Sequence, residues 1–282
     1  MKISVVMVSL NSVVTIGHAV ESFLCQTHAD KELIIVDGGS TDGTLQVVES
    51  LRAPNLRVVS EPDRGLYDGM NKGLALFAGD AIGFLNSDNR FSDEVALAAI
   101  AEGLGEVDMV FGHLDFVLDH DRREVSRRWR TAPYRKGAFR RGWMPAHPTF
   151  YCRREVAETV GTFDLSYAIA SDYDYMLRAF ELSKFTARPI NRVLVDMLHG
   201  GCSTASMWNY VSHNLEALAS RRKWLGTGIV DYALIAKPLR KITQFFLVGH
   251  VPPRDRIATM PMRSGGTRTA RDGFMRANDG KR

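Results

Sequence analysis

The chain has 282 residues, of which 45% are hydrophobic and 24% are charged, with a formal net charge of +4. This composition is typical of a globular protein with one large α/β domain or two smaller ones, and the small net charge argues against nucleic-acid binding. The three cysteines are far apart, which argues against a disulfide framework or a zinc site and indicates a reducing compartment. No run of the sequence reaches the roughly 18 apolar residues of a membrane-spanning helix, so we expect a cytoplasmic protein.

Strand-like and helical patterns alternate over the first 85 residues. Short apolar runs predict buried strands, and apolar residues at intervals of three and four predict helices. We expect strands at residues 3–9, 32–36, 56–60 and 81–85, with helices at residues 13–26, 45–51 and 67–77 between them. Strands that alternate with helices in this way indicate βαβ units and a parallel sheet.

The second half of the chain has a less regular pattern. Strands are expected at residues 107–111, 114–118, 125–129 and 193–197, some of them antiparallel, and a helix at residues 171–182. Residues 205–225 and 229–248 have the pattern of two helices, and the second combines basic with large apolar side chains. A helix of this kind either packs against the domain or lies on a membrane surface. After residue 250, large apolar side chains are too few to order the chain.

The predicted strand at residues 81–85 is followed directly by Asn86-Ser87-Asp88-Asn89. Ligands of open α/β sheets gather at the carboxyl ends of the strands, and carboxylate and amide oxygens suit a hard divalent cation. The same residue types are also common in solvated turns. The pattern therefore leaves two interpretations, a metal site at Asp88 and a turn without a ligand.

Two further polar segments follow predicted strands. Residues 37–43 contain three glycines that allow a tight turn and a close backbone approach to a ligand, and Asp37 is an acceptor for a base or a ribose. Residues 61–73 place Asp68, Asn71 and Lys72 on one face of a helix whose start can bind phosphate. The alternatives are a turn without a ligand and a surface lysine paired with Asp68. Neither a G-x-G-x-x-G nor a Walker A sequence follows any strand.

The helix predicted at residues 171–182 begins with a further candidate, Asp172. An aspartate at this place is either a helix cap or a general base that must reach an acceptor hydroxyl. His147 and His199 are candidates for the same site, although a lone histidine is more often structural. Basic residues crowd residues 122–141, which form either a solvated face or a site for anionic phosphates or an anionic membrane surface.

Together these motifs resemble the inverting glycosyltransferases of family 2. The resemblance rests on Ser9 and Asn11, the loop at residues 37–44, the cluster at residues 86–89 and the helix that begins Ser171-Asp172-Tyr173-Asp174. It covers residues 1–205 and is closest to bacterial enzymes that build exopolysaccharide or O-antigen units on lipid carriers. It implies an α/β GT-A fold, with a Rossmann-like nucleotide-binding half, a mixed sheet, an acceptor half and C-terminal helices.

The resemblance also implies an activity and roles for individual residues. A sugar would pass with inversion from a nucleotide diphospho-sugar to a hydroxyl of a glycan or polyprenyl-diphosphate-linked acceptor, in an enzyme peripheral on the cytoplasmic face of the inner membrane. Asp172 is the implied catalytic base, and Mg²⁺ or Mn²⁺ would be held by Asp88, Asn89 and His199. The implied nucleotide-binding residues are Ser9, Asn11, Asp37, Gly39, Asp63, Gly65, Asn71, Lys72 and Ser87. The residues expected near the acceptor are His147, Arg140 and Arg141.

Two positions depart from the family pattern. Asn89 stands where many members have a second carboxylate, and Gly38 stands where a second aspartate is often found. A catalytically inactive scaffold protein with this fold is therefore an alternative. A sugar nucleotidyltransferase is another, although residues 9–12 are not the glycine-rich basic loop that such an enzyme needs. We expect a GT-A domain at residues 1–204, a helical and membrane-associating extension at residues 205–250, and a disordered basic tail at residues 251–282.

Overall fold

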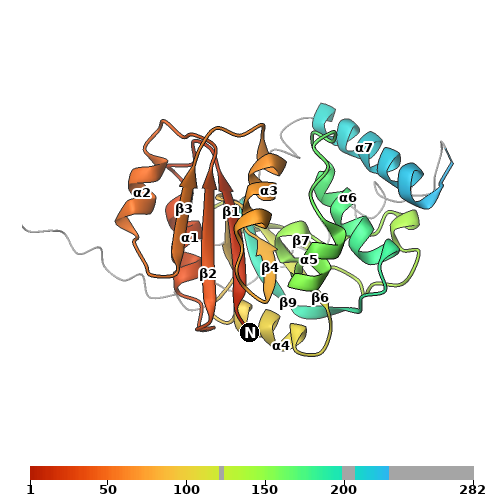
Figure 1. The fold of residues 1–282 in the computed structure, drawn as a ribbon, viewed down its shortest axis with the longest axis horizontal. Coiled ribbons are helices and arrows are strands. Elements are labelled where there is room, and N and C mark those ends of the chain that lie inside the picture. The colour runs from red at the N-terminus through yellow and green to blue at the C-terminus, as the bar shows by residue number, and fades with distance from the viewer. Residues whose placement is uncertain (121–123, 199–206, 229–282) are drawn as a thin grey trace, which may run out of the picture. The chain divides into compact units, whose positions relative to one another are not determined.

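The computed structural model describes residues 1–120, 124–198 and 207–228. Within these residues a nine-stranded mixed sheet forms the centre of the protein, with helices on both of its faces (Figure 1). The strand order is β3-β2-β1-β4-β8-β6-β9-β5, and β7 pairs with β6 outside this path. This architecture confirms the expected mixed α/β fold.

The first half of the sheet is parallel, as the sequence predicts. Its elements are β1 (Ile3–Ser9), α1 (Ile16–Leu24), β2 (Lys31–Asp37), α2 (Thr44–Ser50), β3 (Leu56–Ser60), α3 (Leu66–Leu76) and β4 (Ala81–Phe84). β1 pairs in parallel with β2 and β4, and β2 pairs in parallel with β3. The carboxyl ends of β1, β2 and β3 therefore lie at one edge, where the polar loops follow them.

The second half of the described chain is antiparallel in part. Its elements are β5 (Asn89–Phe91), α4 (Ala96–Leu104), β6 (Met109–Val117), β7 (Val125–Trp129), β8 (Tyr151–Arg153), α5 (Arg154–Val160), α6 (Ser171–Leu177), a π-helical turn (Arg178–Leu182), β9 (Ala187–Leu198) and α7 (Met207–Leu225). β8 pairs antiparallel to β4 and β6, whereas β9 pairs in parallel with β6.

Four details differ from the predicted elements. The strands expected at residues 107–111 and 114–118 are the single strand β6, and the strand expected at residues 193–197 is the end of the longer β9. The segment at residues 86–89 is not only a turn, because Asn89 already belongs to β5. The elements β5, α4, β8 and α5 were not expected from the sequence.

Two apolar cores lie on the two faces of the sheet because successive side chains of a strand point to opposite sides. Val6 and Val8 of β1 belong to the core that includes Met70 of α3, whereas Val5 and Met7 belong to the core that includes α1. α3 approaches β1 closely at two glycines. A β-carbon on Gly69 would lie 2.6 Å from Val8, and one on Gly73 would lie 2.2 Å from Val6.

The helix expected at residues 205–225 is α7, and it packs against α6 and the turn at Phe139–Arg141. Its buried side chains Ala217 and Leu218 show that it contributes to the same compact body as the sheet. The helix expected at residues 229–248 and the tail at residues 251–282 lie outside the described residues. None of the helices in the described ranges has the length and hydropathy required to cross a membrane.

Candidate active site

The loop after β2 is organised around the carboxylate of Asp37, which is fully buried. One oxygen accepts hydrogen bonds from the hydroxyls of Ser9 (3.1 Å) and Ser40 (2.5 Å). The other accepts the hydroxyl of Ser60 (2.8 Å) and the backbone N–H groups of Gly39 (3.1 Å) and Ser40 (2.9 Å). Burial alone would raise the pKa of Asp37, but these hydrogen bonds hold it below its ordinary value. Asp37 thus shapes the loop, and direct base or ribose recognition by it stays a prediction.

The loops after β1 and β4 are joined to the loop after β2. The backbone N–H of Asn11 donates to Ser40 Oγ (2.8 Å), and the N–H of Thr41 donates to Asn11 Oδ1 (3.0 Å). Asn11 has a φ of 48°, a left-handed conformation that asparagine tolerates better than most residues. The hydroxyls of Ser12 and Ser87 lie 2.9 Å apart and link the loops after β1 and β4. The three strand ends therefore form one connected edge.

The segment before α3 lies against the same loop. The carboxylate of Asp63 fills the space beside Gly38, where an added β-carbon would lie 2.6 Å from Asp63 Oδ2. This contact gives a physical reason for glycine at position 38. The other oxygen of Asp63 accepts the N–H of Gly65 at 2.9 Å, and Gly65 has a φ of 112°, which favours glycine.

Two predicted nucleotide-binding residues of α3 have protein partners. The side-chain amide of Asn71 donates a hydrogen bond to the carbonyl of Phe163 (3.0 Å) and accepts one from the backbone N–H of Phe163 (2.8 Å). Asn71 therefore holds the loop before α6 in place. Lys72 donates to the carbonyl of Pro62 (2.8 Å) and pairs with Glu61 (2.9 Å). Among the described residues the ion-pair partner of Asp68 is Arg64, and that of Lys72 is Glu61, so the expected pair of Lys72 with Asp68 is not formed there. Phosphate binding by Lys72 stays a prediction.

The predicted metal ligands differ in exposure. Asp88 is half-buried, and burial raises the pKa of its carboxyl. Within the described residues its carboxylate has no basic partner, and a carboxylate of this kind fits a cation. Asn89 is fully buried, and among the described residues neither polar atom of its side-chain amide has a hydrogen-bond partner. His199 lies outside the described residues, and the described part of the chain contains no group of three His, Cys, Asp or Glu side chains suited to a metal.

His120, which the sequence did not single out, fastens the segment that carries Asp88. Its Nε2 donates to the carbonyl of Asp88 at 3.0 Å, whereas its buried Nδ1 has no hydrogen-bond partner in the part of the chain that the structure describes. Burial lowers the pKa of His120, so a neutral ring is favoured. No local pattern marks this residue, because it meets Asp88 only through the fold.

The predicted acceptor residue His147 lies in the aromatic core. Its ring stacks on Phe84, with centroids 5.4 Å apart, and meets the ring of Phe163 edge-on at 5.8 Å. Burial lowers the pKa of His147 to about 4, so the ring is neutral near pH 7. These contacts match the structural role that the sequence left open, and an acceptor role stays a prediction.

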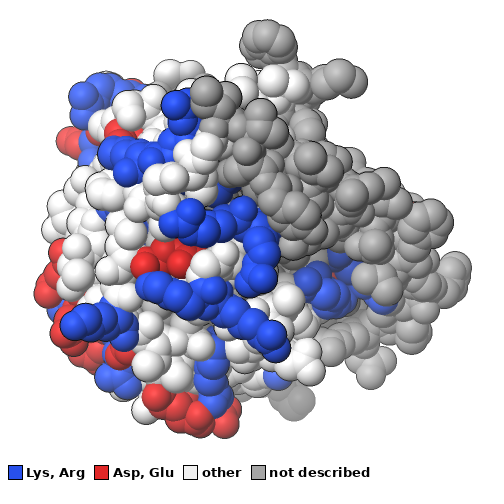
Figure 2. Space-filling view, turned by 90° about the vertical axis from the view of Figure 1, so that its right-hand side faces the viewer, with Lys and Arg blue, Asp and Glu red and all other residues white. Residues whose placement is uncertain are grey.

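Arg140 and Arg141 belong to a basic surface. Figure 2 shows Lys and Arg side chains gathered on the side of the molecule where α6 and α7 lie in Figure 1. Lys136 donates to the carbonyl of Glu181 at 2.5 Å, and Arg140 donates to the carbonyl of Leu225. The segment with these residues therefore lies beside the π-helical turn and the end of α7. We call the exposed basic residues of this segment and of the end of α7 the basic face: Arg135, Lys136, Arg140, Arg141, Arg222 and Lys223.

Asp172, the predicted base, lies in the first turn of α6 and is half-buried. Its Oδ1 accepts the N–H of Tyr173 at 2.7 Å and lies 3.4 Å from the hydroxyl of Tyr67. That hydroxyl donates more directly to the carbonyl of Ile169, at 2.6 Å. Burial and the nearby charge of Asp172 raise the pKa of Tyr67 well above its ordinary value, so it is a neutral hydrogen-bond donor.

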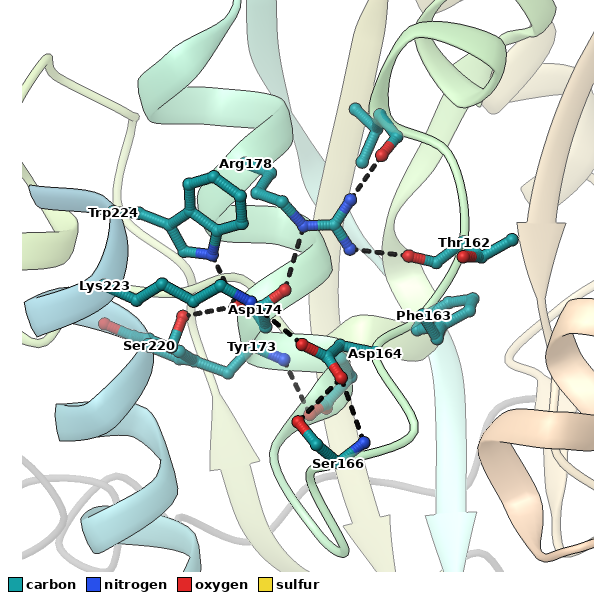
Figure 3. A network of polar contacts seen from close by, with 12 residues as sticks. Thr162, Phe163, Asp164, Ser166, Tyr173, Asp174, Arg178, Ser220, Lys223 and Trp224 are labelled. Carbon is teal, nitrogen blue, oxygen red and sulfur yellow. Dashed lines mark hydrogen bonds and ion pairs between the residues drawn. The ribbon is translucent and has the colours of Figure 1, made fainter.

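Asp174 lies in a network of polar contacts that joins α6 to α7 (Figure 3). Its buried carboxylate accepts hydrogen bonds from Arg178 Nε (2.9 Å), Ser220 Oγ (2.7 Å) and Trp224 Nε1 (2.8 Å). Arg178 also donates to the carbonyls of Val160 and Thr162. These contacts give Asp174 a structural role.

A cavity of about 690 Å³ lies on the Asp174 side of α6. Arg178, Trp224 and the loop around Phe163 line it. Asn71 is the single predicted nucleotide-binding residue among its described lining residues. The cavity is therefore distinct from the edge of the sheet formed by the loops after β1, β2 and β4.

Comparison with known sequences places the chain in a family. Residues 4–168 match the model of Glycosyl transferase family 2. The chain is 32% identical over 199 residues to the PGL/p-HBAD biosynthesis glycosyltransferase of Mycobacterium tuberculosis, over 68% of this chain and 74% of that protein. It is 33% identical over 184 residues to an uncharacterized glycosyltransferase of the same organism, over 63% of this chain and 68% of that protein.

Solved structures show the same fold. The fold of this chain resembles that of S. aureus TarS 1-349 in complex with UDP-GlcNAc, with a TM-score of 0.61 and 18% identity over 83% of this chain and 69% of that chain. It resembles the mannosyltransferase PcManGT from Pyrobaculum calidifontis, in complex with GDP-Man and Mn²⁺, with a TM-score of 0.59 and 18% identity, over 87% and 70% of the two chains. The chain therefore belongs to glycosyl transferase family 2 and has the GT-A fold.

Proposed function

We propose that this glycosyltransferase transfers a sugar, with inversion, from a nucleotide diphospho-sugar to a hydroxyl of a glycan or a polyprenyl-diphosphate-linked acceptor. The donor class is supported by the sugar nucleotides in the two structural neighbours. The cellular role that we propose is the synthesis of a cell-surface polysaccharide at the cytoplasmic face of the inner membrane.

The observation that carries the proposal is the position of α3 between the two halves of the candidate site. The N–H of Gly65, the N-cap of α3, donates a hydrogen bond to Asp63, and the carboxylate of Asp63 packs against Gly38 in the loop after β2. Two residues later, Tyr67 reaches Ile169 and Asp172. The proposed donor loop and the proposed base are thus fixed to one helix, an arrangement that suits a reaction between two bound substrates.

The proposed chemistry is a single displacement. Asp172 accepts the proton of the acceptor hydroxyl while that oxygen forms a bond to the anomeric carbon and the bond to the diphosphate breaks. Attack from the face opposite the leaving group gives inversion without a covalent enzyme intermediate. Asp88, with the amide oxygen of Asn89, would hold Mg²⁺ or Mn²⁺, which when bound offsets the negative charge of the departing diphosphate.

The basic face supports an anionic acceptor. Arg140 and Arg141 are exposed near the end of α7, and this helix also contacts the segment that leads to Asp172. A diphosphate on a lipid carrier, or an anionic membrane surface, is the partner that such a cluster of arginines attracts. We propose that the basic face holds the acceptor in this way.

The function is tested by measuring the release of nucleoside diphosphate from UDP-, GDP- and dTDP-sugars with Mn²⁺ or Mg²⁺ and a membrane extract as the acceptor source. Wild-type release that is lost in Asp88→Ala, in Asp172→Ala and with chelator supports a metal-dependent transferase, and the anomeric configuration of the product tests inversion. Nucleotide binding without turnover from any donor, in the presence of extracts that contain acceptor, would instead favour the inactive scaffold protein.

The role of the basic face needs its own comparison. Arg140→Ala/Arg141→Ala is expected to raise KM for a lipid-diphosphate acceptor about 30-fold, because each of the two charged contacts contributes about 1 kcal/mol near an anionic surface. Arg52→Ala/Arg57→Ala, on the side of the sheet formed by α2 and β3, is the matched control. Equal KM values in the two double variants would remove the acceptor role from Arg140 and Arg141.

A further inference from the structure

One face of α7 is directed at the segment that carries the proposed base. Glu216, Ser220 and Trp224 are spaced by four residues, so they lie in one row along the helix. Glu216 accepts hydrogen bonds from the backbone that begins at residue 168, and Ser220 and Trp224 donate hydrogen bonds to residue 174. The row therefore joins α7 to the segment that includes Asp172.

Glu216 binds the backbone directly before α6. Its Oε1 accepts the N–H of Ala168 at 3.1 Å, and its Oε2 accepts the N–H groups of Ile169 and Ala170, both at 2.9 Å. Three N–H groups donating to one carboxylate form strong, charge-assisted hydrogen bonds. Because Ala170 is the N-cap of α6, Glu216 satisfies one of the free N–H groups at the start of this helix and fixes the two residues before it.

Two other contacts hold the same short segment. On one side the carbonyl of Ile169 accepts the hydroxyl of Tyr67 at 2.6 Å. On the other, Ser220 and Trp224 hold Asp174, two residues beyond Asp172 (Figure 3). α7 is thus hydrogen-bonded to the backbone before Asp172 and to the side chain of Asp174 after it, while the carboxylate of Asp172 faces Tyr67.

We propose that Glu216 is a positioning residue, which keeps Asp172 at the place where it can take the acceptor proton. This inference rests on the proposed function of Asp172. It makes α7 part of the catalytic unit, although the family match ends at residue 168. Loss of the three hydrogen bonds would let the backbone at residues 168–170 shift, and a displacement of about 1 Å near a reacting group can lower a rate about 100-fold.

The test is Glu216→Gln, which keeps the size of the side chain but replaces one acceptor oxygen with a donor. We expect kcat to fall about 10- to 100-fold while the Kd for UDP or GDP, whichever the donor carries, changes less than about twofold. Glu158→Gln is the matched control, because Glu158 is 63% exposed and pairs with Arg154 at 3.6 Å. The control is expected to keep the wild-type kcat.

A purely structural role would have a different result. If kcat falls only in proportion to the folded fraction measured by thermal unfolding, or stays at the wild-type value, the positioning role of Glu216 is wrong. Trp224→Phe is a milder variant that removes the N–H donated to Asp174 but keeps a smaller aromatic ring, and for it we expect a kcat loss of about 3- to 10-fold. An unchanged kcat in folded Trp224→Phe would contradict the proposed coupling to α7.

Asp172→Asn separates this inference from the proposed function. If Asp172→Asn keeps its activity, the assignment of the base is wrong, and with it the role of Glu216. If Asp172→Asn is folded and inactive while Glu216→Gln keeps the wild-type kcat, the base assignment stands and the positioning role alone is wrong.

Discussion

The hydroxyl of Tyr67 lies 2.6 Å from the carbonyl oxygen of Ile169 and 3.4 Å from Oδ1 of Asp172. One phenol thus connects the first turn of α3 with the start of α6. Its pKa is well above the ordinary value because of burial and the nearby carboxylate, so the proton stays on the hydroxyl. Tyr67 therefore acts as a donor that orients this segment.

Removing this hydroxyl is expected to lower activity more than stability. For Tyr67→Phe we expect kcat to fall about 10-fold, equivalent to ~1.4 kcal/mol, because one hydrogen bond to the segment of the proposed base is lost. Steady-state kinetics and thermal unfolding measure the two effects separately.

Tyr134→Phe is the control for Tyr67→Phe. The hydroxyl of Tyr134 donates to the carbonyl of Phe180 at 2.7 Å, so the same kind of hydrogen bond is lost at the other end of the helical segment. Both variants are expected to lose about 1 kcal/mol of stability. Equal kcat values in the two variants would show that Tyr67 has no special link to catalysis.

The parallel half of the fold could be predicted from the sequence because its signals are local. The runs at residues 3–9 and 56–60 match β1 and β3, and the helices expected at residues 45–51 and 67–77 differ from α2 and α3 by one residue at each end. The helix expected at residues 13–26 exceeds α1 by three residues at its start and two at its end. β8 has only three residues, too few for a periodic pattern. β9 was predicted too short because Pro189 lies near its start, and proline usually argues against a strand.

The site was predicted only where its residues follow strands or begin helices. Asp37 and Asp172 occupy such positions, so the sequence singles them out. Glu216 could not be found in this way, since it is 46 to 48 residues away from the N–H groups that it accepts. A polar residue on a helix has no local sign of such a partner. The roles of all these residues stay predictions until they are tested.

The contact between α3 and β1 predicts a large effect of a small substitution. A β-carbon at Gly73 would lie 2.2 Å from Cγ1 of Val6, so Gly73→Ala forces one of the two elements to move. We expect a loss of about 1–3 kcal/mol in the free energy of unfolding, measured with urea. Val6→Ala should recover part of this loss in the double variant, because it empties the space that the new methyl group needs.

Gly17→Ala is the control for Gly73→Ala. Gly17 lies in α1, where an added β-carbon would be 3.5 Å from Val47, an ordinary contact distance. There the same substitution is expected to stabilise the protein by about 0.4–1 kcal/mol, since alanine suits a helix better than glycine. Equal destabilisation at both positions would contradict the close packing of α3 on β1.

The hydrogen bonds to Asp37 predict a dependence of stability on pH. Because the pKa of Asp37 is below its ordinary value in the folded protein, its ionised form stabilises the fold at neutral pH, and this contribution is lost as the pH falls through the folded pKa. Asp37→Asn is expected to cost about 1–3 kcal/mol near neutral pH and less at about pH 3. Urea unfolding across this range measures the difference.

The control for Asp37→Asn is Asp30→Asn, whose carboxylate is 59% exposed. The difference in stability between this variant and the wild type is expected to stay within about 0.5 kcal/mol over the same range. A cost of Asp37→Asn that does not shrink in acid would mean that the ionised carboxylate is not the form that the loop stabilises.

The buried amide of Asn89 predicts how a second carboxylate would behave. Its side chain is fully buried and has no hydrogen-bond partner within the described ranges, so Asn89→Asp would bury a charge beside the half-buried Asp88. Without metal we expect a loss of about 3 kcal/mol or more in stability, since an unpaired buried charge is costly.

Divalent cations should reverse this loss if position 89 faces the proposed metal site. Mn²⁺ is then expected to raise the thermal unfolding midpoint of Asn89→Asp more than that of the wild type, because binding to the folded state stabilises it in proportion to affinity. Asp88→Asn is the control and should lose the Mn²⁺-dependent shift. If Mn²⁺ shifts the midpoints of Asn89→Asp and wild type equally, the side chain at position 89 does not contact the cation. Asp88 would then be the single ligand among the predicted residues that the structure describes, and the weaker site would need the phosphates of the donor to complete it.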